Sequence, residues 1–280
     1  MENLTMKDKV VVITGAGGVL CSAMAKAFAE KGAKVCLLDR NPDAVQLVAK
    51  SITDQGYIAK GFTCNVLEKD SLIACREEIR KAFGPCDILI NGAGGNNAKG
   101  QTSHDYFDPK DIDDPDVQSF FDLELSGFDF VFKLNIIGTF LVTQVFAEDM
   151  VKKRKGNIIN ISSMNSYRPL TRIPAYSSAK AGVSNFTQWL AVHFAGTGIR
   201  VNAIAPGFFS TKQNKTLLFN EDGSLTERSQ KIISHTPMGR FGVPEDLLGT
   251  MLYLADDNVS GFVTGIIIPV DGGFSAFSGV

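Results

Sequence analysis

Short apolar runs alternate with longer, helix-patterned segments along this chain, and this alternation limits the fold more than any other feature. The runs are rich in Val and Ile, and they predict strands at 9–14, 34–39, 57–64, 86–91, 156–162, 199–205 and 265–270. Strands separated by helices predict a parallel sheet covered on both faces. We therefore expect one α/β domain over residues 1–280, a doubly wound parallel sheet of about seven strands whose ligand site lies beyond the carboxyl ends of the strands.

Composition narrows the range of partners. The chain has 280 residues, of which 44% are hydrophobic and 21% charged, enough to bury one large core. A net charge of −2 gives no electrostatic attraction to nucleic acid or to anionic lipid. The longest apolar stretch, Phe128 to Phe146, contains charged and amide side chains, so it predicts an amphipathic helix and no membrane span.

The cysteines and histidines indicate neither disulfides nor a metal site. The chain has five cysteines and three histidines: Cys21, Cys36, Cys64, Cys75, Cys86, His104, His193 and His235. No two of the cysteines form a C-x-x-C pair, and no two of the histidines have metal-ligand spacing. No charged-then-apolar leader opens the sequence. We expect reduced, buried thiols in a cytoplasmic protein without a metal.

A glycine-rich turn follows the first predicted strand. The stretch Thr14 to Cys21 reads TGAGGVLC, and Gly15, Gly17 and Gly18 leave backbone N–H groups free to face a pyrophosphate at a helix N-terminus. It is not G-x-G-x-x-G, because Leu20 occupies the third glycine position. An ordinary strand-to-helix turn is the alternative explanation.

The end of the second predicted strand favours a dinucleotide. Asp39 could accept hydrogen bonds from the ribose hydroxyls of an adenosine and repel a 2′-phosphate, which favours NAD. Arg40 could instead hold that phosphate, so NADP is the alternative. Asn41-Pro42 is the better candidate for the cap of the next helix.

A tyrosine and a lysine four residues apart form the candidate catalytic pair. Tyr176 and Lys180 lie in a helix-forming stretch, so they share one face, and an ammonium beside a phenol is expected to lower the phenol pKa toward neutrality. Tyr106 and Lys110 have the same spacing, but a proline between them interrupts a helix. Ser163, at the end of a predicted strand, adds a hydroxyl at the carboxyl edge of the sheet.

Several motifs together resemble the short-chain dehydrogenase/reductase family, which has a Rossmann fold. In order along nearly the whole chain they are Thr14-Gly15, Asn91-Gly92-Ala93-Gly94, Asn135, Ser163, Tyr176-x-x-x-Lys180, Pro206-Gly207 followed by Thr211, and Val270-Asp271-Gly272-Gly273. The family glycine pattern is T-G-x-x-x-G-x-G, so Val19 and Cys21 stand on two of its glycines.

The resemblance implies the roles of the site residues. Tyr176 would be the general acid/base, Lys180 would lower its pKa and hold the nicotinamide ribose, Ser163 would bind the substrate oxygen, and Asn135 would support a water-linked proton path. The residues implied to bind NAD, or alternatively NADP, are Thr14, Gly15, Gly17, Gly18, Val19, Leu20, Asp39, Asn65, Val66, Asn91, Gly92, Ala93, Gly94, Tyr176, Lys180, Pro206, Gly207, Phe208 and Thr211. Taken singly, Asn135, Ser163 and Thr211 could equally be local capping or hydrogen-bonding residues.

Two long polar segments, 95–126 and 208–240, follow predicted strands and are expected to select the substrate. Arg168 and Arg172 could hold a carboxylate, although a solvent-facing or subunit-facing pair is equally open. Asn96, Asn97, Lys99 and Asn165 would suit a polyol chain. These segments are similar to the sugar-acid branch of the family, the D-mannonate oxidoreductase (fructuronate reductase) type, which implies exchange between D-mannonate and D-fructuronate.

Two other functions stay open at this point: a general polyol or secondary-alcohol dehydrogenase, and a non-catalytic dinucleotide-binding sensor. A sensor would have no need for the four catalytic side chains together. The family resemblance suggests a homotetramer, with contacts from the helix at about 128–150, the Tyr176 helix and the aromatic residues Phe262, Phe274 and Phe277.

Overall fold

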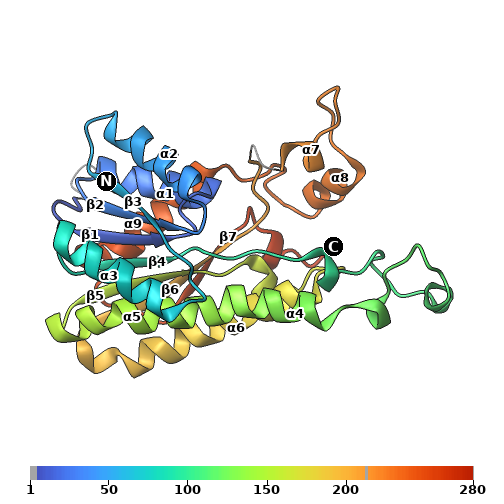
Figure 1. The fold of residues 1–280 in the computed structure, drawn as a ribbon. Helices are drawn as coiled ribbons and strands as arrows, with labels where there is room; N and C mark the ends of the chain where they lie inside the picture. The colour runs from blue at the N-terminus through green and yellow to red at the C-terminus, as the bar shows by residue number, and fades with distance from the viewer. Residues whose placement is uncertain (1–4, 212–213, 280) are drawn as a thin grey trace.

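The computed structural model describes residues 5–211 and 214–279, which form one α/β unit around a parallel sheet (Figure 1). The sheet has seven strands in the order β3-β2-β1-β4-β5-β6-β7, and every neighbouring pair is parallel. The strands are β1 Val10–Thr14, β2 Lys34–Asp39, β3 Ala59–Thr63, β4 Ile88–Asn91, β5 Gly156–Ile161, β6 Ile199–Pro206 and β7 Ile267–Val270. The α-helices are α1 Val19–Glu30, α2 Pro42–Thr53, α3 Lys69–Phe83, α4 Leu125–Phe132, α5 Gly138–Lys153, α6 Pro174–His193, α7 Lys215–Leu218, α8 Glu227–Ser234, α9 Leu248–Ala255 and α10 Asp257–Ser260. The predicted fold class is confirmed.

Alternate strand residues face two separate helical layers. Val11 and Ile13 of β1 pack with α1, α2 and α9, whereas Val10 and Val12 pack with α3, α5 and α6. Strands in such a sheet are buried on both sides, which explains their continuous apolar sequence. The strand order reverses between β1 and β4, so the crevice at the carboxyl ends of these two strands is the expected ligand position.

The longest apolar segment is a core helix. α4, a π-helical segment at Lys133–Ile137 and α5 run continuously over Leu125–Lys153, long and apolar enough by composition to cross a membrane. Half of its most apolar window is buried in the fold, and Val142 and Phe146 pack against the sheet. The predicted amphipathic helix is therefore present and lies against the sheet.

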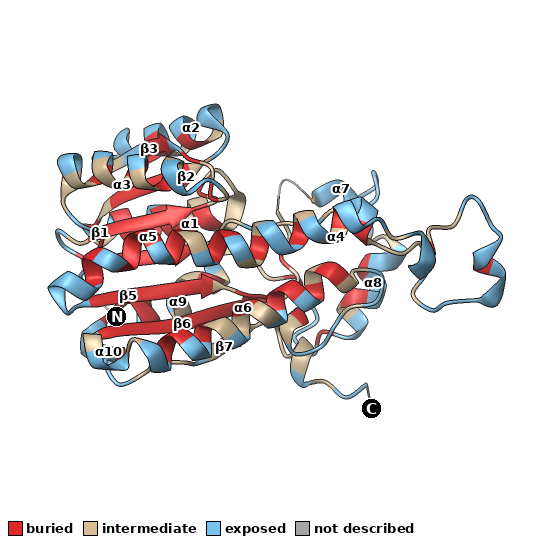
Figure 2. Cartoon of the chain, turned by 60° about the horizontal axis from the view of Figure 1, so that its bottom comes forward, coloured by how far each residue is buried: buried red, intermediate tan, exposed pale blue. Residues whose placement is uncertain are grey.

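The two polar segments project from the carboxyl edge of the sheet (Figures 1 and 2). Residues 98–124 form an extended arm with three short 3₁₀ turns and a largely exposed surface. In the other segment α7 and α8 stand apart from the sheet, around a small apolar cluster of Leu218, Ile232 and Phe241. Tyr106, in the arm, is 84% exposed and not helical, so the Tyr106/Lys110 spacing carries no catalytic meaning.

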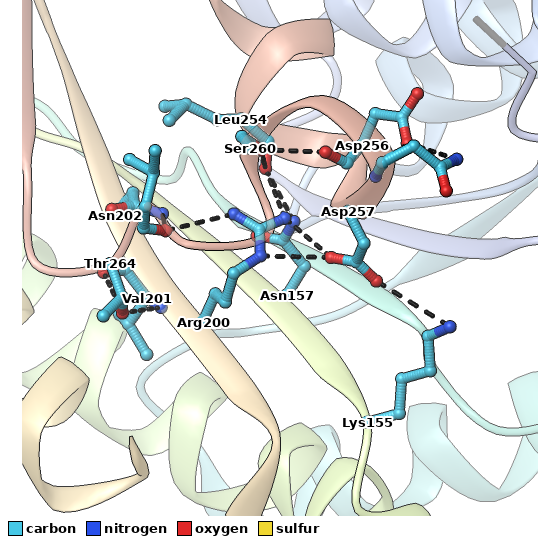
Figure 3. A network of polar contacts seen from close by, with 12 residues as sticks. Lys155, Asn157, Arg200, Val201, Asn202, Leu254, Asp256, Asp257, Ser260 and Thr264 are labelled. Atoms are coloured by element: carbon cyan, nitrogen blue, oxygen red, sulfur yellow. Dashed lines mark hydrogen bonds and ion pairs between the residues drawn. The ribbon is translucent and has the colours of Figure 1, made fainter.

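At the opposite edge, a buried arginine ties the last strands to the helices that precede β7 (Figure 3). Arg200 of β6 donates to Asp257 Oδ1 at 2.7 Å, to the Leu254 carbonyl at 2.9 Å and to the Val263 carbonyl at 3.2 Å. Asn157 of β5 also donates to the Leu254 carbonyl, at 2.7 Å. These bonds satisfy the carboxyl end of α9, where a cation is favourable, and hold β5 and β6 to it.

Candidate active site

The glycine turn after β1 has the geometry of a phosphate-binding turn. Gly15 has φ +67°, and a Cβ there would lie 2.9 Å from Ala93 Cα, so only glycine fits. The Gly17 N–H donates to Asp39 Oδ2 at 3.0 Å, which ties the turn to the end of β2. Gly18 caps α1 without any side-chain hydrogen bond to the first turn. The Gly18 N–H also donates within the turn, to the Gly15 carbonyl at 3.0 Å, so the Gly17 and Gly18 N–H groups are not free as expected. The N–H groups that would face an anion are those of the first turn of α1, which begins at Val19.

The two departures from the family glycine pattern are accommodated locally. Val19 is the first residue of α1 and needs no special backbone angle. Cys21 is buried, and a Cβ on Gly92 would lie 2.3 Å from its Sγ, so the glycine after β4 makes room for the larger side chain. Thr14 Oγ1 accepts the N–H groups of Gly92 and Ala93, both at 3.1 Å, and joins this loop to β1.

The four candidate catalytic residues lie at the carboxyl edge of the sheet, and Asn135 and Lys180 lie beside the loop that follows β4. Tyr176 and Lys180 lie one turn apart on α6, and the Lys180 Nζ is 5.6 Å from the centre of the tyrosine ring. A Cβ on Gly94 would lie 2.7 Å from Asn135 Oδ1 and 3.1 Å from Lys180 Nζ. Ser163 follows β5 and influences the Tyr176 phenol electrostatically. Residues far apart in sequence therefore meet at the carboxyl edge of the sheet.

The expected effect of Lys180 on the Tyr176 phenol is not found. Burial raises the pKa of Tyr176 above its ordinary value, and only the Ser163 hydroxyl acts in the lowering direction. Lys180 directs its ammonium to the Ile161 carbonyl, at 2.8 Å, and burial lowers the pKa of Lys180 to about 8. Desolvation is therefore the main influence on the pKa of both groups, and the phenol stays protonated at neutral pH.

Asn135 lies in the π-helical segment between α4 and α5, which explains how a polar side chain fits an apolar helix. Its Nδ2 donates to the Gly95 carbonyl at 2.8 Å and to the Val131 carbonyl at 2.7 Å, and its Oδ1 accepts the Gly95 N–H at 3.3 Å. The side chain thus fixes the loop after β4 beside Lys180. Such single-turn π-helical insertions are frequent at functional sites.

A cavity of about 350 Å³ collects several of the expected cofactor residues. It begins at the N-terminus of α1 and continues along the segment after β6; its lining includes Val19, Leu20, Gly207, Phe208 and Thr211. Pro206 ends β6, and the Gly207 N–H donates to the Val270 carbonyl at 2.9 Å. Thr211 bonds through its N–H and hydroxyl to Asn214 Oδ1, so it does not cap α7. These residues fit a dinucleotide lying across the carboxyl edge of the sheet.

Other expected cofactor residues have mainly structural contacts. The Asn91 amide donates to Thr143 at 3.0 Å and to Asn160 at 2.8 Å, so its side chain is directed into the core. Asn65 donates to Glu68 at 2.7 Å and accepts the Leu67 N–H at 3.1 Å, which closes the turn after β3. Both side chains contribute by fixing backbone near the site. Asn41 caps α2, as expected, so Asp39 is not needed for the cap and lies beside the glycine turn.

The two arginines proposed for the substrate separate in the structure. Arg172, at φ +65°, lines a cavity of about 590 Å³ between the arm, the segment before α6 and α8. Arg168 does not line it; the Arg168 Nε donates to the Ser275 carbonyl at 3.2 Å on the exterior. The predicted two-arginine fork is therefore wrong, because the chain turns between these residues.

The polar residues of the arm are largely used for local structure. Asn97 caps a 3₁₀ turn, and Asn96 Oδ1 accepts the Asn97 N–H at 2.9 Å. Lys99 pairs with Glu124 at 2.9 Å, so its charge is neutralised. Asn165 is buried and lines a separate cavity of about 470 Å³ that also includes Arg172.

Sequence reasoning missed the basic face of α8. Arg228, Lys231 and His235 line the 590 Å³ cavity together with Arg172. Their spacing of three and four residues is a helical pattern that could have indicated one charged face, but no local motif connects α8 with α6. Phe274, expected at a subunit contact, also lines this cavity and packs edge-on against Phe208.

Known proteins resemble the chain along its whole length. An uncharacterised oxidoreductase of Haemophilus influenzae is 55% identical over 278 residues, 99% of this chain and 97% of its own length. A crystal structure from Haemophilus, provisionally named a D-mannonate oxidoreductase and holding NAD, is 54% identical with a TM-score of 0.95, over 99% of this chain and 98% of that one. A gluconate 5-dehydrogenase of Burkholderia cenocepacia, in complex with NADP and tartrate, is 29% identical with a TM-score of 0.80, over 98% and 97%. A family model for short chain dehydrogenases matches residues 9–222, so the chain belongs to the short-chain dehydrogenase family.

Proposed function

We propose that the protein is an NAD-dependent oxidoreductase that interconverts the alcohol and ketone forms of a sugar acid, with D-mannonate and D-fructuronate as the preferred pair. One observation carries this proposal: Ser163, Tyr176, Lys180 and Asn135 meet at the carboxyl edge of the sheet. At the same edge, the 590 Å³ cavity, whose wall contains basic side chains, adjoins the 350 Å³ cavity of the expected cofactor residues, which we call the dinucleotide cavity. Bound NAD(H) would supply or accept the hydride.

The residues of the chain would handle the proton. In ketone reduction, the Tyr176 phenol donates its proton to the oxygen that develops negative charge, and Ser163 hydrogen-bonds to the same oxygen. Burial keeps the phenol protonated, which suits this direction. Lys180 holds a positive charge near the developing anion, and Asn135 keeps the loop after β4 in place beside it.

The preference for NAD follows from the end of β2. Asp39 Oδ1 accepts the Asn41 N–H at 3.0 Å while Oδ2 accepts the Gly17 N–H, so the carboxylate is fixed beside the turn that would hold the pyrophosphate. A fixed carboxylate there favours ribose hydroxyls over a 2′-phosphate. Arg40 is exposed beside it, which keeps NADP as the alternative cofactor.

The acidic substrate is supported by the cavity. Arg172 donates through Nε to the Thr102 carbonyl at 3.1 Å, which positions the outer nitrogens of its guanidinium for an anion. The names of the Haemophilus and Burkholderia structures, which refer to D-mannonate and to gluconate, point to the same class of compound. A general polyol dehydrogenase is the competing function.

A substrate panel tests this proposal. We would assay D-mannonate, D-gluconate, D-fructuronate and D-tagaturonate with NAD(H) and NADP(H), and the neutral compounds D-mannitol, xylitol and D-fructose beside them. We expect the highest kcat/KM for D-mannonate or D-fructuronate with NAD(H), at least tenfold above the neutral compounds. Higher kcat/KM for D-mannitol or xylitol would establish the polyol alternative.

Localisation and assembly are part of the same proposal. The cytoplasm suits a protein with five buried free thiols. We also propose a homotetramer, because the exposed faces of α5 and α6 carry large apolar side chains, among them Phe140 and Trp189.

A further inference from the structure

One face of α8 lines the 590 Å³ cavity. Arg228, Lys231, Ile232 and His235 recur at helical spacing and all lie in its wall. The helix is held in place because Ile232 is buried in an apolar cluster with Leu218 and Phe241, and Thr226 caps its N-terminus by accepting the Ser229 N–H at 3.3 Å. α8 therefore places three exposed basic side chains at the cavity, with the carboxylate of Glu227 in the same wall.

These basic side chains differ in how far they are already neutralised. Lys231 forms an ion pair with Asp105 of the arm, and Thr171 donates to the same carboxylate at 3.0 Å. The His235 Nδ1 lies 2.8 Å from the Lys231 carbonyl oxygen, within its own helix. Arg228 is different: within residues 5–211 and 214–279, its guanidinium has no hydrogen-bond or ion-pair partner.

Arg228 also occupies a particular position between the two cavities. It lines the dinucleotide cavity with Leu20 and Thr211, and it lines the larger cavity with Arg172. Phe208 and Ile232 are likewise common to both walls, so the two cavities adjoin at this point. A substrate that reacts beside the nicotinamide and extends into the larger cavity would pass Arg228.

We propose that Arg228 is a specificity-determining residue that binds the carboxylate of the sugar acid together with Arg172; this rests on the proposed function. The ketone and the carboxylate of D-fructuronate lie toward opposite ends of its carbon chain. An anion-binding group must therefore stand away from Tyr176, on another wall of the site. A planar guanidinium that has no partner among the described residues can bind a carboxylate through two parallel hydrogen bonds, and it discriminates against a neutral alcohol at the same position.

The experiment compares Arg228→Met and Arg228→Lys with Arg168→Met. The control removes the same charge from an exterior arginine that does not line either cavity. The substrates are D-mannonate and D-mannitol, which differ at the carboxylate, and NAD affinity is measured by fluorescence titration. Circular dichroism confirms that each variant is folded.

For Arg228→Met we expect kcat/KM for D-mannonate to fall at least tenfold more than kcat/KM for D-mannitol, mainly through KM. Arg228→Lys is expected to recover only part of the loss, because it keeps the charge without the planar fork. Arg168→Met should change the ratio less than threefold.

Two results would overturn the proposal in distinguishable ways. If the wild-type enzyme prefers hexonates and Arg228→Met keeps that preference, Arg228 has no such role while the proposed function stands. If NAD affinity falls tenfold and both substrates are affected equally, Arg228 serves the cofactor. A wild-type enzyme that shows no preference for acids refutes both proposals.

Discussion

At the scale of single residues, the proposed chemistry depends on the Tyr176 phenol. Burial raises its pKa, and Ser163 opposes this only in part. A phenol that stays protonated can donate to a ketone oxygen, but it must be ionised to accept a proton from an alcohol. The protein alone is therefore prepared for reduction, and alcohol oxidation should be favoured at higher pH.

Replacing this phenol separates catalysis from cofactor binding. We expect Tyr176→Phe to lower kcat for ketone reduction at least a thousandfold, because the proton donor is lost, while NAD affinity changes less than threefold. Steady-state kinetics and a fluorescence titration measure the two quantities. Turnover that survives with NAD still bound would show that Tyr176 is not the proton donor.

Lys180 makes stability depend on pH. Its pKa is about 8 in the folded protein, because of burial, against 10.5 for an unperturbed lysine. Between these two pKa values the unfolded chain binds more protons than the folded chain, so the free energy of unfolding rises with pH. The free-energy cost of burying the charged lysine is complete below pH 8 and disappears above pH 10.5. The difference corresponds to about 3 kcal/mol.

Lys180→Met isolates this effect. We expect the free energy of unfolding of the cofactor-free wild type, relative to Lys180→Met, to increase by about 3 kcal/mol between pH 7 and pH 10.5. Urea unfolding of both proteins at each pH supplies the measurement, and subtracting the two curves removes the other titrating groups. Parallel curves would mean that the lysine is not buried in its charged form.

At the scale of helices and strands, periodicity predicted the sheet but not every boundary. The predicted strands 57–64 and 265–270 are shorter in the structure, Ala59–Thr63 and Ile267–Val270, because hydrogen-bonded pairing ends before the apolar run does. Glycine, asparagine and proline signals located the turns, since they act through local backbone geometry.

The sequence could predict those features of the candidate site that depend on a single helix or strand. Tyr176 and Lys180 share a helix face because of their spacing. The contact of Asn135 with the loop after β4 depends instead on a π-helical segment, which no local sequence pattern predicted. The separation of Arg168 from Arg172, the burial that raises the Tyr176 pKa and the position of Arg228 all depend on tertiary packing. Local spacing contains no information about them.

The Arg200 contacts give a prediction for this scale. Arg200→Met removes charge-assisted bonds to Asp257 and to two carbonyls at the end of α9 and before β7, and should lower the free energy of unfolding by about 2–3 kcal/mol. Lys155→Met is the matched control: its side chain is 62% exposed and lies 3.9 Å from Asp257, so we expect a change within about 0.5 kcal/mol. Urea unfolding at neutral pH measures the free energy of unfolding of both variants. An equal decrease in the two variants would mean that the Arg200 contacts add no stability beyond that of an exposed charge near Asp257.

At the scale of the whole molecule, the faces of α5 and α6 away from the sheet remain to be explained. Phe140 of α5 packs against Phe186 of α6, which stacks on Trp189, and Trp189 stacks on His193 with ring centres 4.5 Å apart. Trp189 is 55% exposed and Val192 is 79% exposed. α5 and α6 lie side by side (Figures 1 and 2). A row of exposed aromatic rings on two adjacent helices is more typical of a subunit interface than of a solvated surface.

A charge placed in this row should therefore separate the subunits. We expect the wild type to run as an oligomer of its 30.2 kDa chain in size-exclusion chromatography with light scattering, and Trp189→Glu to shift it to smaller species at micromolar concentration. Leu47→Glu is the matched control, because Leu47 is 71% exposed on α2, away from these helices, and should leave the mass unchanged. A wild type that elutes as a single chain would require another explanation for the aromatic row. If Trp189→Glu dissociates the assembly but keeps kcat for D-mannonate, each subunit holds a complete site; a parallel loss of activity would mean that association orders α6, and with it Tyr176 and Lys180.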